Sequence, residues 1–196
     1  MGTLKFQGWD IALNHTAVVE IDELGEVQWF AFTTDKVAIG KAFPEEALHI
    51  HITNLRKQYP KKQKLKAARL AIFCEWIKDI QDREPDLAAV EAYAYGKKNN
   101  AYEIGEYGGA IRKGFIERGI SFMTVSPREI KKFADIDSSE KPIQFCLDEY
   151  GIDWSEYGCG LKSETPGDLA DAHCLAHMAR LNANSKSRID FDPEEA

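Results

Sequence analysis

Four carboxylates in this chain of 196 residues stand where apolar side chains would be expected. Asp10 lies inside the apolar-rich stretch "FQGWDIAL", and Glu91 interrupts the run "LAAVEAYAY". Asp168 and Asp171 begin the stretch "GDLADAHCLAHMAR" on the helical stripe that its small apolar residues continue. An unpaired carboxylate that is buried costs several kcal/mol. The four acids are therefore either separately satisfied or gathered around cations.

Gathering around cations would give these acids a catalytic use. Mg²⁺ and Mn²⁺ prefer carboxylate oxygens, and their charge would offset the repulsion between the acids. Two such ions about 4 Å apart form the clamp that supports in-line attack on a phosphodiester. Each acid also has a structural explanation. Asp168 could cap its helix, Asp171 suits the helix dipole, and Asp10 could face solvent, whereas Glu91 has the weakest such explanation.

The N-terminal part of the chain predicts an antiparallel meander. Residues 3–12, 15–22 and 27–34 each have the composition of a strand, and short links join them. Residues 35–60 give no clear pattern. We expect an irregular insertion there with at most a short helix.

Helices and strands alternate after residue 60. The helix over 61–83 follows from apolar residues at helical spacing, and the apolar run 87–95 has the character of a strand buried on both faces. Ser126 with Glu129 forms a capping box, which predicts a helix start. The remaining expected elements are a helix over 101–118, a strand over 120–127, a helix over 138–151, a loop over 152–166 and a final helix that ends near Asn182.

This order predicts an α/β fold with a mixed sheet, in which three antiparallel strands are followed by parallel strands and helices cover both faces. We expect a single domain over residues 1–183 with the insertion at about 35–60. Residues 184–196 form a polar tail, which we predict to be disordered.

Composition and charge narrow the function classes. The chain is 44% hydrophobic and 29% charged, which is typical of a soluble globular protein. A net charge of −7 at first argues against a nucleic-acid partner, but residues 56–69 hold seven basic side chains and no acid. No signal peptide or membrane span is apparent, so we expect a cytoplasmic protein without a membrane partner. The four cysteines include no C-x-x-C pair, which favours reduced thiols.

Two histidine pairs are weaker candidate sites. His173 and His177 are spaced as zinc ligands on a helix, with Cys174 between them, but no third ligand is evident. We therefore expect exposed helix histidines. His49 and His51 are uninformative.

Four stretches in order resemble the RuvC family of Holliday-junction resolvases, within the RNase H-like nucleases. The similarity covers residues 4–34 and 61–182. The insertion at 35–60 and the net acidity are unusual for the family, and they suggest a divergent member with a viral origin as one hypothesis. The four stretches are "GWDIALNHTAVVEI", "EPDLAAVEAYAYGKKNNAYEIGEYGGAI", "VSPREIKKFADIDSSEKPIQ" and "GDLADAHCLA".

The resemblance assigns roles to particular residues. It implies metal-binding, catalytic acids at Asp10, Glu91, Asp168 and Asp171, with Lys141 as a catalytic cation near the scissile phosphate. Tyr93 and Tyr95 flank the position from which the family stacks an aromatic ring on bases, and Lys97 and Lys98 follow as a basic cluster. The DNA-binding residues expected together are Tyr93, Tyr95, Lys97, Lys98, Lys131 and Lys141.

The expected function is a Mg²⁺-dependent crossover junction endodeoxyribonuclease that holds two ions per active site, with Mn²⁺ as a substitute. The resemblance also implies a homodimer that forms through the helix at 101–118 and acts on four-way DNA junctions. Two alternatives stay open. One is another RNase H-like nuclease, which acts on branched DNA or on RNA–DNA hybrids. The other is a noncatalytic nucleic-acid-binding scaffold of the same fold.

Overall fold

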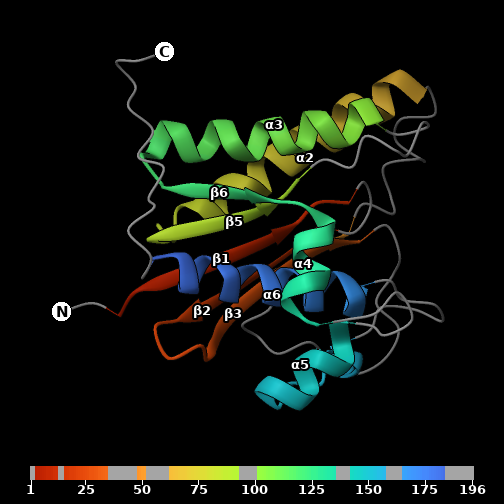
Figure 1. Ribbon diagram of the computed structural model, residues 1–196. Coiled ribbons are helices and arrows are strands. Elements are labelled where there is room, and N and C mark those ends of the chain that lie inside the picture. Colours follow the sequence, from red (N-terminus) through yellow and green to blue (C-terminus); the bar gives the residue numbers. More distant parts are fainter. Residues whose placement is uncertain are drawn as a thin grey trace.

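A six-stranded sheet in the order β4-β3-β2-β1-β5-β6 forms the centre of the molecule. Figure 1 shows the computed structural model, in which α2 and α3 lie on one side of the sheet and α6 crosses the other. The structure describes residues 3–12, 16–34, 48–51, 62–92, 101–135, 142–157 and 165–183.

The strands are β1 Lys5–Asp10, β2 Ala17–Asp22, β3 Val27–Thr34, β4 Leu48–His51, β5 Leu87–Glu91 and β6 Phe122–Val125. The helices are α2 Lys62–Gln81, α3 Ala101–Arg118, α4 Pro127–Phe133, α5 Pro142–Tyr150, the short 3₁₀ helix η1 Trp154–Tyr157 and α6 Thr165–Ala183.

Strand pairing follows the predicted mixed pattern. β1, β2 and β3 form an antiparallel meander, and β5 and β6 continue the sheet parallel to β1. A parallel strand needs a crossover, and here α2 leads into β5 and α3 into β6. The predicted α/β mixed sheet with helices on both faces is therefore confirmed.

The insertion at 35–60 differs from its prediction. We expected at most a short helix, but Leu48–His51 forms β4, which pairs parallel to β3 at the edge of the sheet. A four-residue strand that pairs on one side only carries little periodicity of its own, so only the neighbouring strand defines it. The rest of the insertion lies outside the described residues, as does the tail at 184–196.

Element ends account for the other differences. The strands expected over 3–12 and 87–95 end at Asp10 and Glu91, so each ends on an acid. The capping box at Ser126 is present as predicted. The loop expected over 152–166 contains η1. Among the described helices, none is long and apolar enough to cross a bilayer.

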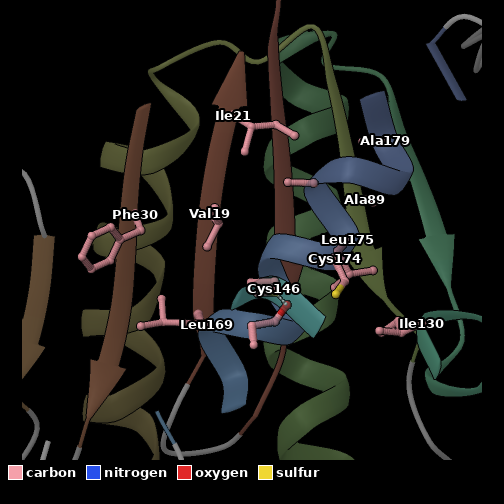
Figure 2. Close-up of a cluster of buried hydrophobic side chains, with 14 of the residues drawn as sticks. Val19, Ile21, Phe30, Ala89, Ile130, Cys146, Leu169, Cys174, Leu175 and Ala179 are labelled. Carbon is pink, nitrogen blue, oxygen red and sulfur yellow. Dashed lines mark hydrogen bonds between the residues drawn. The ribbon is translucent and has the colours of Figure 1, made fainter. Parts of the chain in front are cut away.

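The sheet divides the apolar core into two clusters because side chains alternate along each strand. Phe6 of β1 packs on the α6 side with Val19 and Leu175, as part of the cluster drawn in Figure 2. Trp9 of β1 packs on the opposite side, where it meets Trp76 of α2 at 6.1 Å and Phe115 of α3 at 5.6 Å between ring centroids. Asp10, two residues after Gly8, falls on the α6 side.

Gly8 brings the backbone of α6 directly onto β1. A Cβ atom at this position would lie 1.9 Å from the carbonyl oxygen of Ala172 and 2.3 Å from the nitrogen of Ala176. A glycine within a strand often marks such a close approach of another backbone. Gly8 therefore sets the height of α6 above the strand that ends at Asp10.

We predict that Gly8→Ala lowers the free energy of unfolding by about 3 kcal/mol or more, because α6 has to move away from β1 to make room for the methyl group. Urea unfolding followed by circular dichroism measures the change. Gly167→Ala on α6 is the matched control, since nothing lies within 4 Å of that position. It should stabilise the protein by up to about 1 kcal/mol. Equal effects of the two substitutions would contradict the close contact.

Candidate metal centre

Asp10 and Glu91 end two neighbouring parallel strands. Trp9 of β1 pairs with Val90 of β5, so the next residue of each strand lies at the same edge of the sheet. Both side chains lie on the α6 side, by the alternation that puts Ala89 in the α6 cluster. The carboxyl groups of Asp10 and Glu91 are joined by a hydrogen bond.

α6 supplies the other two acids from above the same edge. The negative charges of Asp168 and Asp171 act on Asp10, and Asp171 also interacts with Glu91. These side chains come from the first two turns of α6, directly before the segment that rests on Gly8. The structure therefore brings all four predicted acids together, from three separate elements.

Burial and mutual repulsion change the ionisation of this group. The pKa of Asp10 is raised well above its usual range, first by burial, then by the hydrogen bond with Glu91 and by the charges of the other three acids. Burial and the charge of Glu91 raise the pKa of Asp171 to about 7. Asp10 and Asp171 are therefore harder to ionise than ordinary carboxyl groups, and a bound cation would favour their charged forms.

Glu20 shows how this fold satisfies a buried carboxylate elsewhere. It lies on the opposite face of the sheet with 1% of its surface exposed. Arg83 donates to it at 2.8 Å, and the Gln7 side chain donates at 2.9 Å. Asp10, which is 6% exposed, has a second carboxyl group as its hydrogen-bond partner instead. The cluster at the sheet edge is therefore not built as a structural ion pair.

Lys131 is a basic side chain of the described residues that acts on this cluster. β6 ends at Val125, which pairs with Glu91, and α4 starts two residues later. One turn along α4, the positive charge of Lys131 lowers the pKa of Asp171. The resemblance implied a DNA-binding role for Lys131; the structure brings this side chain to the acids, and its role stays a prediction. Tyr93, Tyr95, Lys97, Lys98 and Lys141 lie outside the described residues.

The donor set fits a hard divalent cation. Four carboxylates offer the oxygens that Mg²⁺ and Mn²⁺ prefer, and a divalent charge would oppose the effects of burial and repulsion that raise the pKa of Asp10 and Asp171. Among the described residues, no group of three or more histidine, cysteine, aspartate or glutamate side chains is arranged as ligands around one point. The acids therefore interact here, and their role as metal ligands stays a prediction.

Two solved structures share this arrangement of strands and helices. One is Thermus thermophilus RuvC in complex with Holliday junction substrate, which is 17% identical with a TM-score of 0.58 over 92% of this chain and 96% of that chain. The other is a Thermus thermophilus RuvC structure, which is 17% identical with a TM-score of 0.57 over 91% of this chain and 97% of that chain. This chain has a RuvC-like fold. No protein-family model and no curated protein matches it.

The prediction of exposed histidines is wrong. Within the RuvC-like fold, His173 and His177 of α6 are buried, with exposed fractions of 0% and 2%. The i, i+4 spacing places them on one face of α6, but only the packing of α5 and η1 decides whether that face meets solvent. Cys174, between them, is buried as a free thiol, and so is Cys146.

Sequence reasoning also missed Gly8. A glycine two residues before Asp10, inside an apolar strand, was a readable signal of close backbone approach. The identity of the approaching element was not readable from the strand alone.

We predict that Asp10→Asn raises the free energy of unfolding by about 2 kcal/mol in EDTA at pH 8, because the amide replaces a buried carboxyl group whose ionisation is opposed in the folded state but free in the unfolded chain. Glu20→Gln is the matched control, since it also neutralises a buried carboxylate but leaves Arg83 without its charged partner. It should destabilise the protein. Urea unfolding of the wild type and of the two variants measures whether each substitution raises or lowers the free energy of unfolding. Destabilisation of similar size in both variants would contradict mutual repulsion at Asp10.

Proposed function

We propose that this chain is a metal-dependent endonuclease that hydrolyses phosphodiesters of branched DNA, with four-way junctions as its main substrate. One observation supports this proposal most directly: four acids act on one another at one edge of the sheet, namely Asp10, Glu91, Asp168 and Asp171. An acid cluster that opposes its own ionisation is suited to divalent cations. The Thermus thermophilus structure bound to Holliday junction substrate has the same fold, which supports the choice of substrate.

Each acid has a definite place in this proposal. Asp10 and Glu91 would hold one ion, and Asp10 with Asp171 or Asp168 would hold the other. Bound there, the two ions supply a water molecule activated for attack and neutralise charge at the leaving 3′ oxygen. Burial of Asp10 excludes water from this side of the cluster, and β1 and β5 fix the carboxyl groups of Asp10 and Glu91 relative to each other.

Basic side chains near the cluster support binding of a phosphate backbone. Lys131 and Lys132 of α4 are exposed beside the acids. α2 ends near the start of β1, where the Lys5 side chain donates to the backbone carbonyl of Arg83. The opposite end of α2, which is its basic N-terminal end, therefore lies toward the acids at the end of β1. Lys66 in that part of α2 is exposed. A protein with net charge −7 can therefore present positive charge where DNA would lie.

The direct test is cleavage of a synthetic four-way junction with Mg²⁺, Mn²⁺ or EDTA. We expect cleavage with either metal and none with EDTA. Asp10→Asn and Glu91→Gln should each lower the cleavage rate by about a thousand-fold or more, since each removes a carboxylate that would hold an ion. Asp79→Asn on the exposed side of α2 is the control and should cleave like the wild type.

A substrate panel separates the proposal from its alternatives. Flap, duplex and RNA–DNA hybrid substrates are compared with the junction under the same conditions. If the RNA–DNA hybrid is cleaved faster than the junction, the hybrid and not the junction is the main substrate. Junction binding without cleavage in any metal would identify a noncatalytic scaffold.

We propose further that the active form is a homodimer joined through α3. Several glycines of this helix weaken it, each by up to about 1 kcal/mol. Gly114 is explained within the chain, because a Cβ atom there would lie 1.9 Å from Oε1 of the Gln81 side chain. Gly105 and Gly109 instead face positions with nothing within 4 Å. A second copy of the chain would explain these two glycines.

The apolar residues of α3 fit a symmetric pairing. Tyr102 is 91% exposed and Ile116 is 46% exposed. They lie seven residues on either side of Gly109, so all three share one stripe of the helix. In an antiparallel pair of helices centred on Gly109, Tyr102 of each copy would lie opposite Ile116 of the other, as a two-fold interface requires.

We predict that Gly109→Arg converts the dimer into a monomer, because the long charged side chain prevents close approach of the two helices. Sedimentation velocity measures the change. Ala71→Arg is the control, an exposed small residue of α2 that lies outside the stripe, and it should leave the dimer intact. A monomeric wild type at the concentrations that cleave junctions would contradict the proposed dimer.

A further inference from the structure

Two buried histidines of α6 form a hydrogen-bonded chain with η1. The Trp154 indole N–H donates to Nδ1 of His173 at 3.2 Å. Nε2 of His173 lies 3.1 Å from Nε2 of His177, one turn further along the helix. Trp154, His173 and His177 expose 1%, 0% and 2% of their surfaces. The chain is therefore shielded from water along its whole length.

The donor at one end fixes the direction of the chain. Because Nδ1 of His173 accepts from Trp154 at 3.2 Å, a neutral His173 carries its proton on Nε2 and donates it to Nε2 of His177. A neutral His177 then carries its proton on Nδ1, so the contact of that nitrogen with Nη2 of Arg180, at 3.5 Å, is the weak one of the three. The reverse direction would put a proton on Nδ1 of His173, facing the indole N–H. Burial lowers the pKa of His173 to about 3 and that of His177 to about 4, so both are neutral at ordinary pH.

Aromatic rings hold the two ends of this chain in place. The Tyr150 ring of α5 stacks on His177, with centroids 3.8 Å apart and planes 10° from parallel. The Trp154 ring contacts Phe30 of β3 edge-on at 5.4 Å. α6 is thus connected through its histidines to α5, to η1 and, through Trp154, to the sheet.

The contacts of α6 with the strands on its sheet side differ in kind. Gly8 meets the backbone of Ala172 and Ala176 there, and Leu175 packs on the apolar strands, so these contacts are close but not directional. Leucines in place of the histidines would bury more apolar surface without the cost of burying polar atoms. Hydrogen bonds, by contrast, are directional. The bond from the η1 indole to His173 specifies one rotation of α6 about its axis, and the bond between the two histidines within the helix orients the His173 ring that accepts the indole N–H.

We propose that His173, held between Trp154 and His177, is a positioning residue that fixes the rotation of α6 and so holds Asp168 and Asp171 against Asp10 and Glu91. His173 follows Asp171 by two residues on the same helix, so a rotation that releases one also displaces the other. The effect on metal affinity rests on the proposed function, whereas the effect on the acids does not.

A double-mutant cycle tests the positioning without any metal. Urea unfolding in EDTA at pH 8 gives the stabilisation caused by Asp10→Asn in the wild type and in His173→Leu. If the imidazole holds the acids together, they separate in His173→Leu, and the gain from Asp10→Asn falls to about half or less. Trp154→Phe removes the indole donor and part of the ring volume but keeps an aromatic side chain, and it should reduce the gain in the same direction even if His173→Leu does not fold.

Two further backgrounds distinguish positioning from general loss of stability. His173→Asn can keep an acceptor near the former Nδ1 position, and it should restore most of the gain. Gln81→Leu removes a buried side chain that donates to the Ile111 carbonyl on the opposite face of the sheet, and it should leave the gain unchanged. The same gain in the wild type, His173→Leu and Trp154→Phe would overturn the proposal.

Mn²⁺ titration by calorimetry connects the inference to the proposed function. His173→Leu should weaken Mn²⁺ binding by about ten-fold, as loss of a residue that orients ligands typically does, and His173→Asn should recover it. A wild type that binds no Mn²⁺ and cuts no DNA, but shows the reduced gain in the cycle, would overturn the proposed function and leave His173 as a positioning residue. Unchanged Mn²⁺ affinity in His173→Leu, together with an unchanged gain, would overturn the positioning role alone.

Discussion

The contact between Gly8 and the backbone of α6 is the constraint on which the rest of the structure depends. No other residue type leaves room for the Ala172 carbonyl and the Ala176 nitrogen so close to β1. The small residues of α6 allow that approach. As a consequence, the acids at the start of the helix lie over the end of β1. The close packing of α6 on β1 is therefore part of the core of the protein, and it also holds the acids of the candidate site in place.

The same arrangement also places like charges close to one another at the sheet edge, which is electrostatically unfavourable. Glu20 shows that this fold can neutralise a buried carboxylate with an arginine and an amide. At Asp10 it places three further acids instead, and burial together with their repulsion raises the pKa of Asp10. Natural proteins accept such local conflict mainly where a function requires it. The apolar packing of α6 against the sheet holds the acids in place despite that repulsion.

The Trp154–His173–His177 chain complements the Gly8 contact. One side of α6 comes close to the sheet because Gly8 has no side chain, and the other side fixes the rotation of the helix through a directional bond. Neither side alone determines where the carboxylates of Asp168 and Asp171 lie. A site that binds small ions needs both, because its ligands must be placed to within a fraction of an ångström.

Much of the fold and of the site was predictable from the sequence. Alternation and helical spacing predicted the mixed sheet, and acids in apolar stretches marked Asp10, Glu91, Asp168 and Asp171, since local patterns report which residues enter a core. β4 was not predictable, because a short edge strand is defined by its neighbour. The similarity to the Thermus thermophilus RuvC structure, at 17% identity, confirms the fold and leaves the residue roles to experiment.

The sequence by itself determined which residues are apolar, which elements form and which acids break the pattern, because these properties depend on neighbours along the chain. Only the tertiary structure decided that Asp10 and Glu91 share a hydrogen bond, that Lys131 acts on Asp171 and that His173 and His177 are buried. Those outcomes depend on how closely α4, α5, η1 and α6 pack on the sheet. That closeness is set by contacts between residues far apart in the chain, such as Gly8 and Ala172.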